Sequence, residues 1–105
     1  MRTPVFIMLA ASLIAANHAM AADGEMLANK NNCMMCHAMD GKSTGPSFRE
    51  IATKYKNTKE AQTTLEAKVR NGGKGVWGSM PMPATARSVS DGDIKSMVRW
   101  LLLLK

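Results

Sequence analysis

The sequence predicts a small all-α domain of about four short helices. Apolar residues recur at helical spacing in several segments after residue 22, and the alternating patterns and β-branched clusters typical of strands are missing there. The stretch from Gly72 to Ser88 is rich in Gly and Pro and has no sustained period, so it is either a long ordered loop or a disordered segment. No internal repeat divides the chain after residue 22, which indicates one domain.

The first 21 residues are expected to be an export signal rather than part of this fold. Arg2 precedes the apolar run VFIMLAASLIAA, and an A-x-A cleavage pattern ends at Ala21. The alternative is a membrane anchor, but the run is shorter than the ~20 residues that span a bilayer. We therefore assign 1–21 to a cleaved signal peptide and 22–105 to the mature domain, exported to an oxidising compartment such as the periplasm.

The mature chain is short and basic. Removing residues 1–21 from 105 leaves 84 residues, whose 13 basic and 8 acidic side chains give a net charge of +5 once Arg2 is lost. Such a charge favours acidic partner surfaces. A domain this small usually needs an internal staple, and aromatic residues are only 5% of the chain. A planar cofactor would complete such a core.

Two helices are expected in the first half of the mature chain. The segment 23–33, DGEMLANKNNC, has good helix formers in its middle and should form a short helix that runs into Cys33. The segment 47–55, SFREIATKY, has apolar residues at i, i+3, i+4 and i+7, which predicts an amphipathic helix with one buried face: Phe48, Ile51, Ala52 and Tyr55.

Two further helices are expected in the second half. Asn57 or Thr58 can cap the first of them, with Glu60 placed for a capping box. Residues 71–73 should end this helix, and its buried side is Leu65 and Val69. For the last helix, Ser90 is the expected cap, with Asp93 three residues later, and the buried stripe is Ile94, Met97, Val98, Leu101 and Leu102.

Both cysteines lie in CMMCH, residues 33–37, beside the only histidine of the mature chain. A zinc site needs four ligands and would have to recruit Asp40, an unusual choice. A dithiol redox centre needs a cysteine of low pKa, usually in a strand–helix context that is missing here, and a disulfide across so short a loop would stabilise little. The C-x-x-C-H spacing is instead typical of covalent haem attachment.

In this interpretation every residue of the motif has a task. Cys33 and Cys36 form thioether bonds to the haem vinyl groups, and His37 is an axial iron ligand. Because the mature chain has no second histidine, the opposite position falls to a Met, Lys or Tyr, or stays open. Among the methionines, we expect Met26 and Met97 in the core, while three lie too close to His37 to cross the haem: Met34, Met35 and Met39.

Met80 and Met82 remain as candidates for the opposite ligand. Pro81 and Pro83 fix φ on both sides of Met82 and favour a stiff, extended backbone, so Met82 is the better-held thioether.

With these features the chain resembles the bacterial class I c-type cytochromes of the small c-551/c-552 type. The resemblance covers 22–105 and rests on motifs in the family's order: CMMCH at 33–37, TGP at 44–46, NGGKGVWG at 71–78, PMP at 81–83 and a terminal helix with Trp100. It implies the small cytochrome c fold, with about four short helices around one covalently bound haem c and its iron. It also implies that Met82, not Met80, is the distal ligand.

The resemblance implies roles for further residues. The Pro46 carbonyl should accept the proton of the non-ligating His37 nitrogen, although Gly45–Pro46 could be merely a turn. Trp77 matches the Trp whose indole binds a haem propionate, with simple packing as the alternative. Lys68 stands where some relatives have an Arg near that propionate, and Lys lacks the planar fork. Thr85 stands where some members have an Asn that bonds the ligand sulfur, so this contact does not carry over.

These features predict a soluble periplasmic one-electron carrier with no catalytic residues, not an enzyme. It would shuttle electrons between respiratory partners with acidic or apolar docking faces, such as an upstream donor and a terminal reductase or oxidase. We expect a monomer that binds no nucleic acid and is not embedded in the membrane. The expected docking patch is Met34, Met35 and Met80, bordered by lysines that could equally be ordinary solvated charges: Lys30, Lys42 and Lys54.

Two alternatives stay open at this point. One is a haem sensor or ligand-binding protein in which CO, NO or peroxide displaces Met82. The other is an interaction subunit of a larger respiratory complex.

Overall fold

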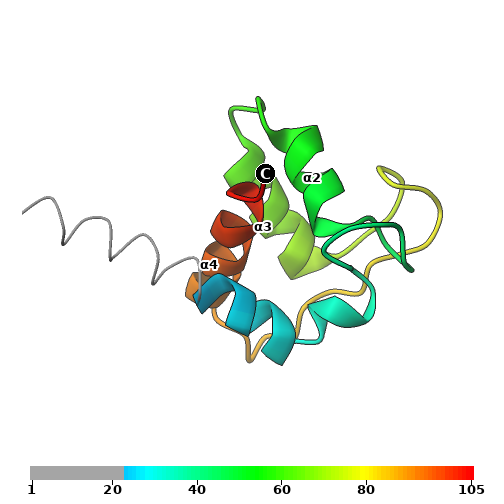
Figure 1. The fold of residues 1–105 in the computed structure, drawn as a ribbon. Coiled ribbons are helices and arrows are strands. Elements are labelled where there is room, and N and C mark those ends of the chain that lie inside the picture. Colours follow the sequence, from blue (N-terminus) through cyan, green and yellow to red (C-terminus); the bar gives the residue numbers. More distant parts are fainter. Residues whose placement is uncertain (1–22) are drawn as a thin grey trace, which may run out of the picture.

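The computed structural model describes residues 23–105, so the predicted signal peptide lies outside the described residues. Within this range the chain is helical at 23–30 and then forms a short 3-10 helix, η1, and three α-helices: η1 (Cys33–Met35), α2 (Phe48–Tyr55), α3 (Ala61–Asn71) and α4 (Asp91–Leu102). Residues 23–105 contain no strand, only an isolated bridge between Gly73 and Met82. The all-α prediction is confirmed (Figure 1).

The 23–30 helix crosses α4 with the two backbones almost in contact. A Cβ atom at the buried Gly24 would collide with the Cβ atom of Trp100 and lie 2.6 Å from the Ser96 carbonyl oxygen. Ala28, one turn further on, is also buried. Because this face meets α4, Met26 points away from it and is 66% exposed. The expectation that Met26 faces the core is therefore wrong.

Helix α2 begins with a reciprocal capping box. The buried Ser47 hydroxyl accepts a hydrogen bond from the Glu50 backbone N–H, and the Glu50 carboxylate accepts one from the Ser47 N–H, both at 3.1 Å. Both N-terminal donors are thus satisfied where the helix enters the core. The predicted face is confirmed, with Tyr55 only partly buried beside three buried residues: Phe48, Ile51 and Ala52.

Helix α3 begins later than predicted. The Thr58 N–H donates to the Tyr55 carbonyl at 3.0 Å and the Ala61 N–H donates to the Thr58 carbonyl at 3.2 Å, so consecutive turns occupy the segment that was expected to start the helix. The N-cap is Glu60, whose side chain makes no cap hydrogen bond, and the predicted capping box is therefore wrong. The predicted end is confirmed at Gly72, which has φ 68°.

Helix α4 supplies much of the core. The Ser90 hydroxyl accepts a hydrogen bond from the Asp93 N–H at 3.1 Å, as predicted. Four of the five predicted stripe residues are buried, Leu102 is only partly so, and Trp100 joins them. The helix packs against α2 and α3. The side chains of α2, α3 and α4 thus form one apolar core.

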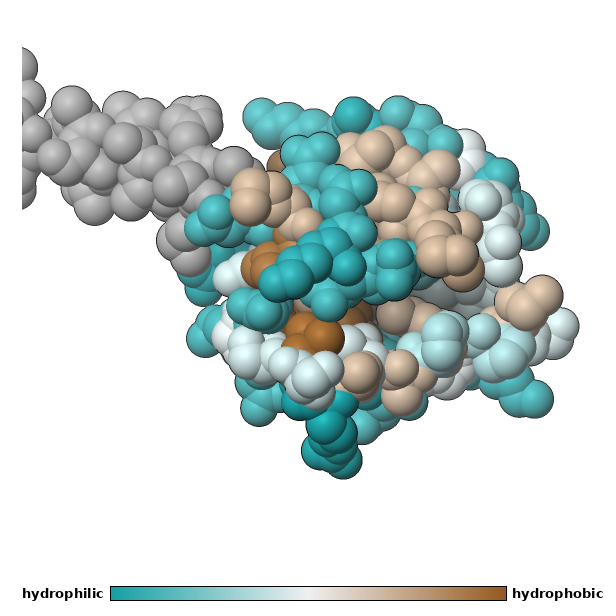
Figure 2. All heavy atoms as spheres, turned by 90° about the horizontal axis from the view of Figure 1, so that it is seen from below, coloured by the Kyte–Doolittle hydropathy of each residue, from teal (hydrophilic) through white to brown (hydrophobic). Residues whose placement is uncertain are grey.

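The face seen in Figure 2 is mixed, with hydrophilic residues beside a broad area of moderately hydrophobic ones, and strongly hydrophobic residues show only in small areas. No helix within residues 23–105 is long and apolar enough to cross a membrane.

Candidate cofactor site

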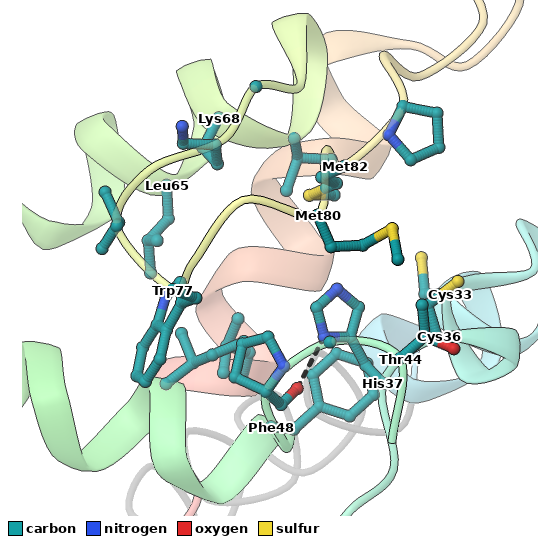
Figure 3. A pocket seen from close by; sticks show the side chains of 18 of the residues that line it. Cys33, Cys36, His37, Thr44, Phe48, Leu65, Lys68, Trp77, Met80 and Met82 are labelled. Atoms are coloured by element: carbon teal, nitrogen blue, oxygen red, sulfur yellow. Dashed lines mark hydrogen bonds between the residues drawn. The ribbon is translucent and has the colours of Figure 1, made fainter. Parts of the chain in front are cut away.

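One cavity brings together the residues that the sequence singled out. Its walls come from the Cys33–His37 segment, the 44–48 segment, α2, α3, α4 and the 73–83 loop. Every predicted site residue lines it: Cys33, Cys36, His37, Pro46, Lys68, Trp77 and Met82 (Figure 3). Residues separated by half the chain therefore face a common space.

The 3-10 turn places both thiols and the imidazole on the cavity. Asn32 has a left-handed φ of 63°, which ends the first helical segment and starts η1. The His37 N–H donates to the Cys33 carbonyl at 3.0 Å and closes the turn. Both thiols are free, and in Figure 3 both cysteines lie at the same end of the site.

The environment of Cys33 does not favour a thiolate. Burial raises the pKa of the Cys33 thiol above its ordinary value. A redox dithiol needs the opposite shift, because the thiolate is the reactive form. Within residues 23–105, no group of three or more His, Cys, Asp and Glu side chains is arranged to hold a metal ion.

A hydrogen bond to Pro46 and packing on Phe48 orient the His37 ring. Its Nδ1 lies 2.7 Å from the Pro46 carbonyl oxygen. Because a carbonyl can only accept, Nδ1 carries the proton, and in the neutral ring Nε2 then keeps its lone pair for a metal. The ring also packs on Phe48, with the centroids 5.3 Å apart. The dashed line in Figure 3 marks the Pro46 contact, and the rest of the ring extends into the cavity.

Gly45 belongs to this arrangement, although its place in the sequence indicates only a turn. Its N–H donates to the Cys36 carbonyl at 2.8 Å. A Cβ atom here would lie 3.0 Å from Cε1 and 3.2 Å from Nδ1 of His37. Only glycine lets the backbone approach the ring this closely without displacing it. Its place directly before Pro46 was the available signal.

Both candidate thioethers line the cavity, but they are held differently. Met82 lies across the cavity from His37, and its backbone pairs with Gly73 in both directions, at 2.8 and 3.0 Å. Met80 also extends into the space, is 67% exposed and has no such pairing. Of the two, Met82 therefore has the more firmly held backbone.

The polar residues predicted for the site lie away from the thiols. Lys68 and Trp77 line the opposite end of the cavity (Figure 3). Trp77 is 43% exposed, and the Lys54 ammonium lies 5.4 Å from its ring centroid. The Thr85 hydroxyl donates to the Val69 carbonyl at 2.6 Å, so its proton is committed to the backbone and not to a methionine sulfur.

The residues present fit a flat, covalently attached cofactor. The cavity walls are largely apolar, two free thiols stand at one end, and an oriented imidazole nitrogen faces a thioether across the space. The cationic Lys68 and the indole of Trp77 suit acidic groups at the other end. All of these are features that a haem c would use.

Comparison with known proteins agrees with a haem-binding site of this kind. A family model for cytochrome c matches residues 21–105. The chain is 44% identical over 96 residues to cytochrome c-552 of Nitrosomonas europaea, covering 91% of this chain and 90% of that protein. It is 37% identical over 98 residues to cytochrome c-551 of Pseudomonas aeruginosa, covering 93% and 92% respectively.

The fold agrees with solved structures as well. The crystal structure of wild-type Nitrosomonas europaea cytochrome c552 superposes with a TM-score of 0.72 at 44% identity, over 77% of this chain and 99% of that one. The Class 1 cytochrome MtoD from Sideroxydans lithotrophicus superposes with a TM-score of 0.68 at 31% identity, over 77% and 91%.

Proposed function

The chain belongs to the cytochrome c family as a small class I c-type cytochrome, and from that premise we propose that it is a periplasmic electron carrier with a His37/Met82-ligated haem c. The observation that carries the proposal is that His37 and Met82 lie on opposite sides of one cavity. The imidazole is oriented by the Pro46 carbonyl at 2.7 Å, and the Met82 backbone is paired with Gly73.

The residues at the thiol end would hold the cofactor in place. The family carries haem c, and the spacing of Cys33 and Cys36 followed by His37 fits its attachment motif. The two sulfur atoms would form the thioether bonds, so the haem would be retained whether or not the chain is folded. At the other end, Trp77 and Lys68 would bind the propionates.

When bound, the haem supplies an iron that exchanges one electron between its ferric and ferrous forms. His37 and Met82 would both bind the iron, which would leave no site on the metal for a substrate. The Met82 thioether is soft and neutral and would favour the reduced state, so this ligand pair would raise the reduction potential. The work of the protein is to hold both ligands through the redox change and to exclude water.

The predicted export signal, cleaved after Ala21, would place the carrier in the periplasm. There we propose that it acts as a monomer between respiratory partners, an upstream donor and a terminal reductase or oxidase. Met35 and Met80 are exposed and Met34 is partly buried against the core, so the expected docking patch has two accessible apolar side chains. Lys54 lies against Trp77 at the other end of the cavity, so Lys30 and Lys42 are the lysines that would attract acidic partner faces beside this patch.

The mass and visible spectrum of the exported protein test this function together. The proposal requires the mass of residues 22–105 plus one haem, and a low-spin spectrum in both oxidation states that carbon monoxide does not change. A mass without haem would end the proposal. A prompt spectral shift of the ferrous protein with carbon monoxide would instead indicate a ligand-binding protein.

A further inference from the structure

We propose that Arg70 is a positioning residue that holds the segment carrying Met82 in place, an inference that rests on the proposed function. Arg70 lies in the last turn of α3, and its side chain is only 17% exposed. Its Nη1 donates to the Ala86 carbonyl at 3.2 Å, and its Nη2 donates to the Val89 carbonyl at 2.7 Å and to the Asp91 carboxylate at 2.8 Å.

These contacts join three parts of the chain. One guanidinium connects the end of α3, the irregular segment that follows Met82, and the first residue of α4. A planar fork with several fixed donors suits this task, because it can serve two carbonyls and a carboxylate at once. The segment 83–90 lacks helix or strand, so side-chain contacts of this kind define its path.

The Arg70 contacts complete a series of tethers on the C-terminal side of Met82. Met82 itself pairs with Gly73, and Thr85 bonds to Val69 through both its hydroxyl, at 2.6 Å, and its N–H, at 3.2 Å. Beyond Thr85, the carbonyls of Ala86 and Val89 accept from Arg70. Releasing Arg70 would let this segment move away from α3, and the thioether would follow it away from His37.

The residue pattern around Arg70 does not indicate this role. A basic residue in the last turn of a helix is common, because it interacts favourably with the helix dipole and the terminal carbonyls. In α3 the last turn also contains Lys68, which instead lines the cavity. Arg70 differs from Lys68 because its side chain points toward Ala86, Val89 and Asp91.

The test measures how readily imidazole displaces the thioether in the ferric holoprotein. The displacement is monitored by the loss of the far-red absorption band that thioether ligation produces. We compare wild type with Arg70→Ala, Arg70→Lys and the control Arg87→Ala, which removes an exposed positive charge from the same segment. The displacement constant should rise about 10-fold in Arg70→Ala, since hydrogen bonds from a charged donor are lost. Arg70→Lys should fall in between, and Arg87→Ala should stay within about 2-fold of wild type.

The outcomes separate this inference from the function on which it rests. If Arg70→Ala behaves like Arg87→Ala, or lowers only the unfolding midpoint and leaves imidazole displacement unchanged, Arg70 is not a positioning residue. If the wild-type protein shows no thioether band at all, the proposed ligand set is wrong, and the positioning role of Arg70, which depends on that ligand, is wrong with it. Arg70→Lys keeps the comparison possible should Arg70→Ala not mature.

Discussion

Gly72 ends α3 where the chain passes directly behind the Met82 segment, and its replacement by Ala should be strongly destabilising. Gly72 has φ 68° and ψ −159°, a combination that essentially only glycine adopts. An added Cβ atom would collide with the Met82 carbonyl oxygen and lie 2.8 Å from the Ala84 nitrogen. These neighbours are backbone atoms, so they cannot move aside as a flexible side chain would.

The magnitude follows from two costs. A non-glycine residue in such a backbone region costs about 1–3 kcal/mol, and forcing an extra carbon into packed backbone costs about 1–3 kcal/mol. Partial relaxation makes about 3 kcal/mol a fair expectation for the loss in unfolding free energy of Gly72→Ala.

Gly41 provides the matched control. It has φ 74°, but an added Cβ atom would meet no atom within 4 Å. Gly41→Ala should therefore cost only the left-handed backbone, about 1–2 kcal/mol. Denaturant unfolding of the two holoproteins gives both values. If Gly72→Ala is no more destabilising than Gly41→Ala, the expected cost of the close approach between Gly72 and the Met82 segment is wrong.

Two further outcomes are expected. Ser47→Ala removes the buried hydroxyl that accepts the Glu50 N–H and should lower the unfolding free energy by about 1 kcal/mol, measured by denaturant titration; an unchanged midpoint would contradict the role of this cap. Electron exchange with an acidic redox partner should slow as ionic strength rises, because lysines around the docking patch would steer the encounter; rates that do not change with salt in stopped-flow measurements would exclude that steering.

The helices were predictable where their periodicity is strong, and the errors have local causes. The stripe of α4 and the face of α2 follow from apolar spacing. The predicted start of α3 was wrong because backbone turns after Tyr55 compete with side-chain capping at Thr58. Met26 was misplaced because the segment 23–30 gives no clear apolar face until Gly24 is known to pack on α4.

The candidate site was predictable to the extent that its chemistry is local in sequence. The CMMCH motif placed Cys33, Cys36 and His37 together, and the flanking prolines predict Met82 rather than Met80 as the second ligand. Gly45 and Arg70 were missed for the same reason. Each meets groups that only the fold brings near, the His37 ring for Gly45 and the carbonyls of Ala86 and Val89 for Arg70. The place of Gly45 directly before Pro46 was the one trace of this in the residue pattern.

The central claim is that Met82 is the second iron ligand, and a pair of variants tests it directly. Both Met80 and Met82 line the cavity, so Met82→Ala and Met80→Ala remove similar thioethers two positions apart. The far-red absorption of the ferric holoprotein should disappear in Met82→Ala while the haem mass remains, and it should persist in Met80→Ala. A Met82→Ala protein that keeps this band, or a Met80→Ala protein that loses it, would contradict the account.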